Sequence, residues 1–130
     1  MLHSAAINQK PDIVRELLSH GASVNLINDE GSTALMAAAE TGDLSVIKML
    51  CDHSADVNLQ TEQGDTALLT ACAHQHDLAV SLLLEAGASV NTLTLNGNSP
   101  LMAAAARGAD KCVRLLLTAG ANVELESNDG

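Results

Sequence analysis

One thirteen-residue phrase occurs three times in this chain at a constant spacing. It reads GSTALMAAAETGD at 31–43, GDTALLTACAHQH at 64–76 and GNSPLMAAAARGA at 97–109, so each copy starts 33 residues after the previous one. A fixed period of this kind is typical of arrays in which each unit buries its hydrophobic face against its neighbours. We therefore expect residues 1–130 to form a single domain of stacked copies.

The copies align without a gap over 28–60, 61–93 and 94–126, after an incomplete first copy at 1–27 and before the start of another at 127–130. Small and aliphatic residues recur at the same places in the copies. Examples are Gly31, Gly64, Gly97 and Gly130; Leu17, Leu50, Leu83 and Leu116; and Val24, Val57, Val90 and Val123. These shared residues are expected to form the core, because stacking needs them in every unit.

Each complete unit is predicted to begin with a turn, as at 28–31, followed by a short helix. The turn glycine supplies a positive φ. A residue able to cap a helix comes next in each complete copy, at Thr33, Thr66 and Ser99, and Pro100 falls at a tolerated first helical position. Gly42 and Gly108 end this helix after about two turns. The third copy has Gln75 there, so its first helix is expected to end differently.

A second helix is predicted next, because Val46, Ile47, Leu50 and Cys51 form one apolar stripe at helical spacing. A small residue follows this helix in each copy, at Gly21, Ser54, Gly87 and Gly120. The chain is 47% hydrophobic but contains no Phe, Tyr or Trp, and it is rich in Ala and Leu. This composition favours helices over a sandwich or a barrel. The predicted fold class is all-α.

The repeated letters resemble the ankyrin repeat. T-A-L-M-A-A, T-A-L-L-T-A and S-P-L-M-A-A resemble the family's T-P-L-H-x-A motif, and G-A-S-V-N, S-A-D-V-N and G-A-N-V-E resemble its G-A-D-V-N ending. The resemblance covers essentially the whole chain at the family's own period. It implies an ankyrin-repeat solenoid of stacked helix–turn–helix pairs with projecting β-turn or hairpin fingers. It also implies a concave binding face made of first helices and fingers.

One departure from the family motif concerns its histidine. That residue is present only as His3, and Met36, Leu69 and Met102 replace it in the other copies. In the family this histidine ties neighbouring repeats together by hydrogen bonds. The join between repeats is therefore expected to depend more on apolar packing here.

The variable positions identify the residues expected to contact a partner. Residues at core positions recur in each copy because stacking needs them. Residues in the fingers and at the ends of the first helices change from copy to copy. Ankyrin proteins typically use these positions for binding. The predicted partner-binding residues are Asp29, Glu30, Ser32, Glu40, Glu62, Gln63, Asp65, His74, Leu95, Asn96, Asn98 and Arg107.

Charge limits the class of partner. The formal net charge is −10 with only six Lys and Arg, so nucleic acid and anionic membrane surfaces are disfavoured. Acidic residues occupy the first two complete fingers, whereas 92–95 reads T-L-T-L, and Arg107 is the one cation expected on the binding face. These features predict a protein partner with a basic segment next to an apolar one. The chain itself is expected to be monomeric.

Catalytic and metal sites are not predicted. His74 and His76 are two apart in a loop, with no cysteine or carboxylate at a spacing that completes a zinc site. His20 and His53 share one repeat position, which favours a structural stacking role. Cys72 stands where other copies have alanine, which indicates a small buried residue rather than a nucleophile. We expect no enzyme activity, no cofactor and no metal.

The cysteines and the N-terminus bear on location. Cys51, Cys72 and Cys112 are odd in number and lie in apolar runs, which is typical of free thiols in a reducing compartment. No signal-peptide pattern and no apolar run long enough for a membrane helix is present. An intracellular, cytoplasmic protein is predicted, with the nucleus as an alternative.

One modification is a hypothesis from the resemblance. Asn25, Asn58 and Asn91 lie at the V-N step where an asparaginyl hydroxylase modifies many ankyrin proteins, and L-C-D-H-S-A-D-V-N around Asn58 is the closest match. Glu124 excludes the fourth copy. The alternative is a turn-stabilising asparagine whose side chain caps nearby backbone, and this alternative is favoured.

The copies begin after a finger and stop inside one, with Leu2 and Val123 expected near exposed ends. Natural arrays cover their ends with polar repeats, which indicates a segment of a longer array. The leading functional hypothesis is a non-catalytic protein-interaction module of a larger scaffold or adaptor. The alternatives are a substrate-recruiting arm of an enzyme, such as a ubiquitin ligase or kinase, and a tether in a channel or cytoskeletal protein.

Overall fold

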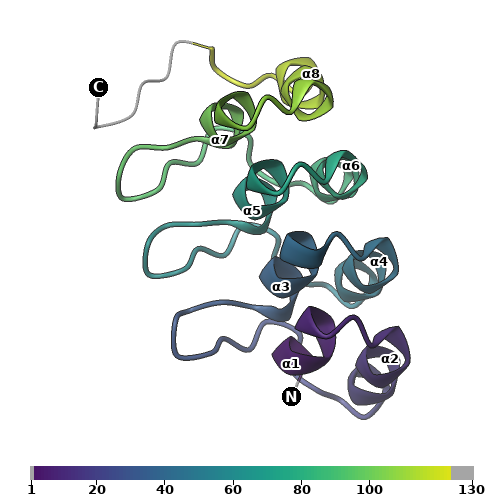
Figure 1. The fold of residues 1–130 in the computed structure, drawn as a ribbon. Helices are drawn as coiled ribbons and strands as arrows, with labels where there is room; N and C mark the ends of the chain where they lie inside the picture. The colour runs from purple at the N-terminus through teal and green to yellow at the C-terminus, as the bar shows by residue number, and fades with distance from the viewer. Residues whose placement is uncertain (1, 124–130) are drawn as a thin grey trace.

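The computed structural model describes residues 2–123, and within them it contains eight helices and no strand (Figure 1). They are α1 (Leu2–Ile7), α2 (Pro11–Ser19), α3 (Ala34–Thr41), α4 (Leu44–Asp52), α5 (Ala67–Ala73), α6 (Asp77–Glu85), α7 (Pro100–Ala106) and α8 (Asp110–Thr118). The predicted all-α class is confirmed. The predicted start of a further copy at 127–130 lies outside the described residues, as does Glu124.

The helices form two rows, with long turns projecting from one side (Figure 1). The inner row holds α1, α3, α5 and α7, and the outer row holds α2, α4, α6 and α8. Each helix contacts its partner in the same repeat and the equivalent helix of the next repeat. The turns at 28–32, 61–65 and 94–98, here called fingers, lie on the far side of the inner row. The predicted stacked solenoid is therefore confirmed.

The core is one continuous aliphatic cluster that runs through all four repeats. Small residues such as Ala38, Ala71 and Ala104 are fully buried in the inner row, whereas Leu50 and Leu83 are fully buried in the outer row. Small side chains allow the inner helices to approach closely, and larger side chains occupy the space between the two rows.

The two ends of the described chain differ from each other. Leu2 lies in α1, the first helix of the inner row, and its side chain is only 6% exposed because α1 packs against α3 and this side chain joins the core. Val123 is 68% exposed, as expected.

The predicted helix caps are confirmed. The hydroxyl oxygens of Thr33, Thr66 and Ser99 accept hydrogen bonds from the backbone N–H three residues later, at 3.3, 3.2 and 3.2 Å. All three caps are buried, so each bond satisfies polar groups that water does not reach. Pro100 occupies the first position of α7, as predicted.

The prediction that the first helix of the third copy ends differently is wrong. Gln75 adopts a φ of +60°, close to the +76° and +66° of Gly42 and Gly108 at the equivalent places. The turn between the two helices requires this left-handed conformation whichever residue occupies it. A side chain in that region costs about 1–2 kcal/mol, which the packed helices on either side offset.

Each finger is built around a polar side chain at its base. Asn28 Oδ1 accepts hydrogen bonds from the backbone N–H groups of Glu30 and Ser32, at 2.9 and 3.0 Å. The hydroxyls of Thr61 and Thr94 accept equivalent bonds from the backbone four residues later, at 3.2 and 3.1 Å. The bases of the fingers are therefore fixed by local hydrogen bonds, independently of the variable residues at the tips.

Successive fingers also contact each other directly. The N–H of Glu62 donates to the carbonyl of Glu30 at 3.4 Å, and the N–H of Leu95 donates to the carbonyl of Gln63 at 3.0 Å. A Cβ atom placed on Gly64 would lie 2.9 Å from the Cα of Thr94. Glycine is therefore needed at this position for close approach as well as for its φ of +87°.

A second tie between repeats is formed by Asn25, Asn58 and Asn91. Each Oδ1 accepts a hydrogen bond from the backbone N–H of the residue 31 positions later, at 2.7, 2.8 and 2.7 Å. The Nδ2 of Asn58 also donates to the carbonyl of Gly87 at 3.2 Å. The expectation that these side chains cap nearby backbone is wrong, because their partners belong to the next repeat.

Replacing Gly64 by alanine tests the close approach of the fingers. We expect Gly64→Ala to lower the free energy of unfolding by about 1–3 kcal/mol more than Gly87→Ala does, measured by urea denaturation. Gly87 has a similar φ of +95°, but a Cβ there would meet no atom within 4 Å. Both variants carry the backbone strain, so equal losses would contradict the finger contact.

Replacing Asn58 tests the tie between repeats. Asn58→Ala removes both hydrogen bonds, and we expect a loss of about 1–2 kcal/mol in the free energy of unfolding. Asn58→Asp retains the acceptor and should lose less. The matched control is Asn96→Ala at a fingertip, which should change stability by less than about 0.5 kcal/mol. If Asn58→Ala is as mild as this control, the tie contributes nothing.

Candidate functional site

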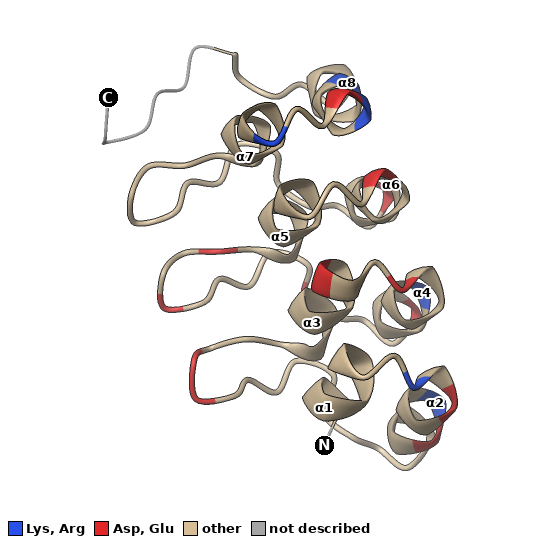
Figure 2. Ribbon diagram, in the orientation of Figure 1, with Lys and Arg blue, Asp and Glu red and all other residues tan. Residues whose placement is uncertain are grey.

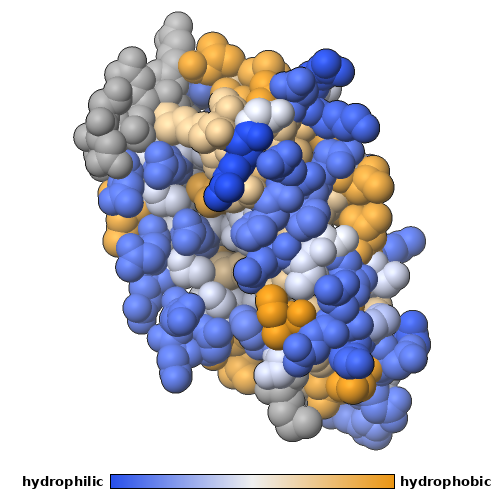
Figure 3. Space-filling view, viewed as in Figure 1, coloured by the Kyte–Doolittle hydropathy of each residue, from blue (hydrophilic) through white to orange (hydrophobic). Residues whose placement is uncertain are grey.

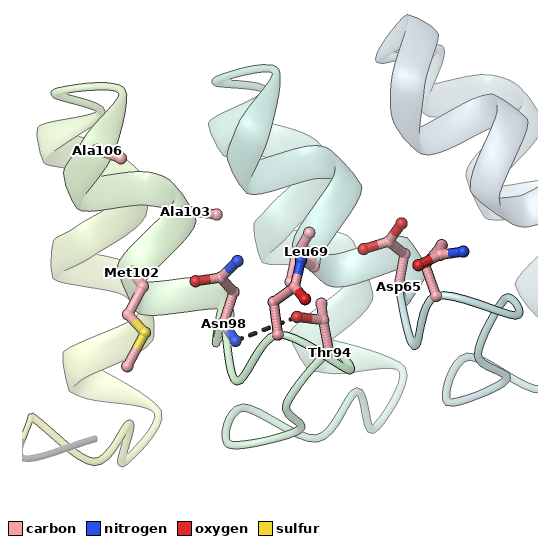
Figure 4. A pocket seen from close by; sticks show the side chains of 9 residues that line it. Asp65, Leu69, Thr94, Asn98, Met102, Ala103 and Ala106 are labelled. Atoms are coloured by element: carbon pink, nitrogen blue, oxygen red, sulfur yellow. Dashed lines mark hydrogen bonds between the residues drawn. The ribbon is translucent and has the colours of Figure 1, made fainter. Parts of the chain in front are cut away.

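A cavity of about 410 Å³ lies between the 61–65 and 94–98 fingers and the inner helices α5 and α7 (Figure 4). We call it the finger groove. Its lining residues are Gln63, Asp65, Leu69, Thr94, Asn96, Asn98, Met102, Ala103 and Ala106. The fingers supply the polar side chains, and the inner helices supply the apolar ones.

The walls of the finger groove are held in place by the finger hydrogen bonds. Figure 4 shows the bond from the Asn98 backbone N–H to the Thr94 hydroxyl, at 3.1 Å. The apolar part is formed by the first turns of α5 and α7, where Leu69 and Met102 are half-buried. A partner segment would therefore meet fixed polar groups on one side and an aliphatic surface on the other.

Four of the predicted partner-binding residues line the finger groove: Gln63, Asp65, Asn96 and Asn98. Glu62 and Leu95 are exposed on the same two fingers, and Arg107 is exposed at the end of α7. The others lie elsewhere along the array and do not line this cavity: Asp29, Glu30, Ser32, Glu40 and His74. Apart from the half-buried Ser32, this last group is exposed.

The apolar residues of the groove were missed at the sequence level. Leu69 and Met102 occupy the place of the family's motif histidine, and they were considered only as a departure that affects stacking. The available signal was their position, because His3 at the same place in the first copy is the residue that the resemblance expects to reach the neighbouring repeat. Ala103 and Ala106 follow on the same side of α7 and leave the cavity open because their side chains are small.

His76 joins two repeats. Its Nε2 lies 2.9 Å from the carbonyl oxygen of Glu40 at the end of α3 and donates to it. The imidazole fills the space beside Gly42, where an added Cβ would lie 2.7 Å from Nδ1. The His74 ring stacks on it with centroids 6.2 Å apart. Residues 2–123 contain no group of three or more His, Cys, Asp or Glu side chains that could hold a metal ion.

Of the remaining histidines, His20 and His53 contact their own helices, whereas His3 contacts the next repeat. His20 and His53 follow the ends of α2 and α4, where His53 Nδ1 bonds the Met49 carbonyl at 2.8 Å and His20 Nε2 lies 3.5 Å from Glu16. The predicted role of this pair in stacking one repeat on the next is wrong, because each of these histidines contacts a residue of its own helix. His3 Nε2 lies 3.4 Å from Asn28 Nδ2 and so reaches the following finger, as the resemblance implied.

Charge is distributed unevenly over the two rows (Figure 2). Red segments occupy the 28–32 and 61–65 fingers, the 94–98 finger carries no charge, and the end of α7 is blue at Arg107. The outer helices α2, α4 and α8 carry both signs, and α6 carries only Asp77 and Glu85. Arg15 pairs with Asp12 on α2 at 3.1 Å. The finger face is therefore predominantly acidic.

The three cysteines are free, with Cys72 and Cys112 buried and Cys51 half-buried. Burial raises the pKa of the Cys72 thiol to about 12, with a smaller contribution from Cys112. Burial also raises the pKa of Cys112 and Cys51. A nucleophilic cysteine needs a lowered pKa, so these thiols have the opposite of the required environment.

Thiol titration tests this environment. At pH 8 the raised pKa leaves Cys72 with a thiolate fraction roughly 1,000-fold below that of an exposed cysteine, so we expect labelling only on unfolding. The neutral thiol is favoured in the folded state. The free energy of unfolding should therefore fall as pH rises from about 8.5 toward 12.

The matched control for this experiment is Cys72→Ala, because alanine stands at this position in the other copies. The variant should fold and should lose part of the decline in stability at alkaline pH. Rapid labelling of Cys72 in the folded protein would contradict its burial.

The comparisons with known proteins agree with this architecture. The chain matches a family model for ankyrin repeats in three copies, over residues 1–61 and 54–127. None of the curated proteins compared with it is similar enough to match. No helix among residues 2–123 is both long and apolar enough to cross a membrane. Since the family matches cover nearly the whole sequence, this chain belongs to the ankyrin-repeat family.

Proposed function

We propose that the chain is a non-catalytic protein-interaction module that binds a partner peptide or domain along its fingers and inner helices, as part of a larger scaffold or adaptor. Ankyrin repeats are generally protein–protein interaction modules. The observation that carries the proposal is the finger groove. It combines a preformed polar wall with an aliphatic floor on the side of the array where the residues vary most.

The charge pattern defines the proposed partner. Asp29, Glu30 and Glu62 are exposed on two successive fingers, and Asp65 lies at the edge of the groove. Leu95 on the next finger is 66% exposed. A partner with Lys or Arg along one part and apolar side chains along the next would match this order. The chain has no Tyr or Trp, so any aromatic anchors belong to the partner.

Two further proposals concern location and modification. The buried free thiols support a reducing compartment, and we assign the protein to the cytoplasm, with the nucleus as alternative.

Asn25, Asn58 and Asn91 are candidate hydroxylation sites whose side chains bond the next repeat. A hydroxylase would have to separate those loops first. Intact-mass spectrometry after exposure to the enzyme tests this, and no added oxygen would exclude the sites.

Charge reversal on the fingers tests the proposed function. The probe is a fluorescent peptide with four Arg or Lys residues followed by a Leu- and Trp-containing segment, titrated by anisotropy. Glu30→Lys combined with Glu62→Lys should weaken binding at low salt by about tenfold or more. The loss should shrink in about 0.5 M salt, where screening is strong.

The matched control is Glu16→Lys combined with Glu85→Lys, which makes the same two charge reversals at exposed positions on the outer helices α2 and α6. It should leave the affinity within about twofold of the original, because it is far from the fingers. Unchanged affinity in the finger double variant at low salt, or an equal loss in the control, would contradict binding at the acidic fingers.

A further inference from the structure

A second hollow lies on the outer row, away from the fingers. It has a volume of about 300 Å³ and is bounded by α6 and α8, with Leu78 and Ser81 on one side and Lys111, Arg114 and Leu115 on the other. Figure 3 shows hydrophobic residues at the edge of the molecule beside α6 and hydrophilic residues over α8. We propose that this hollow docks an acidic amphipathic helix of a second protein, independently of the finger groove.

The hollow exists because the third repeat departs from the others at two positions. Where this repeat has Leu78, the other copies have Asp12, Ser45 and Lys111. At the position of Ser81, the other copies have the long cations Arg15, Lys48 and Arg114. An apolar side chain thus replaces polar ones, and a small side chain replaces three long ones. Both changes border the same cavity.

Leu78 is the apolar edge of this hollow. Its side chain is 61% exposed, although it belongs to a helix whose Val80 and Leu83 are fully buried. One exposed leucine is ordinary on a protein surface. Here it faces a hollow that Leu115 of the neighbouring helix also lines, so an apolar side chain inserted between them would lose contact with water on two sides.

The charges around the hollow select an acidic partner. Within the described residues Lys111 and Arg114 form no ion pair, whereas Arg15 at the position equivalent to Arg114 is paired with Asp12. Asp77 lies at the start of α6 and also borders the hollow, so the lining carries two cations and one anion. On a chain of net charge −10 this is a local excess of positive charge. Partner carboxylates would lie along α8.

The size of the hollow suits one or two aliphatic side chains. A volume of about 300 Å³ is at the lower end of ligand pockets. A helix that presents Leu at positions i and i+4, with Glu beside them, supplies an apolar ridge and two flanking carboxylates. The two parallel outer helices provide the groove for such a ridge.

The test uses a 16-residue helical peptide with Leu at i, i+4 and i+7 and Glu at the flanking positions, titrated into the ¹⁵N-labelled full chain. We expect saturable amide shifts clustered on α6 and α8 around Ser81 and Leu115. A peptide with Lys in place of Glu should bind about tenfold more weakly or worse. Reversing the finger carboxylate with Glu62→Lys should leave this binding unchanged, which separates the two sites.

Two variants establish the hollow as the site. Ser81→Gln fills it with a long neutral side chain and should weaken binding at least about tenfold without altering charge. Ser45→Gln makes the same substitution on the exposed face of α4 and should leave binding unchanged. Both variants should unfold at the same urea concentration as the parent.

Three results would overturn the proposal. The first is the absence of saturable shifts up to about 1 mM peptide. The second is equal binding by Ser81→Gln, or shifts centred on the finger groove. The third is a dimer, detected by sedimentation, that Ser81→Gln dissociates, since this would assign the hollow to a second copy of the chain.

Discussion

Contact between successive repeats is the interaction on which this structure depends. A single repeat has a short inner helix, a nine-residue outer helix and no aromatic side chain, so it cannot enclose a core alone. Stacking closes the core, because Leu50, Leu83 and Leu116 become inaccessible to water in successive outer helices. Alanine in the inner row makes this contact close. Aliphatic packing of this kind is strong but has little directional preference.

The polar contacts between repeats fix how each repeat is oriented relative to the next. The asparagines at the V-N step, the backbone bonds between fingers and the bond from His76 to Glu40 each join one repeat to the next. Hydrogen bonds depend on distance and angle, so these ties select one register among many that the apolar surfaces would tolerate. The same register aligns the fingers on one side and the outer helices on the other. Both proposed docking surfaces therefore result from it.

The fold was predictable from the sequence because its signals are local and recur at a constant spacing: the caps at Thr33 and Thr66 and the glycine positions appear in successive copies 33 residues apart. The partners of the asparagines at the V-N step and the missed groove residues depend on the neighbouring repeat, whereas the turn at Gln75 and the contacts of His20 and His53 lie within one repeat. Gln75 shows that a left-handed turn can be imposed by the helices around it. The reach of Asn58 to the next loop, and the meeting of Leu69 with the following finger, exist only after stacking. The polar residues of the groove were therefore predicted, and its aliphatic residues were not.

The single-file stack is tested most directly by paramagnetic broadening from a nitroxide attached at position 63, on the tip of the middle finger. The account predicts comparable loss of amide signal intensity on the 28–32 and 94–98 fingers, which flank it, and little loss on α4, α6 and α8. Broadening of one neighbouring finger without the other, or strong broadening on the outer helices, would contradict an ordered stack with all fingers on one side.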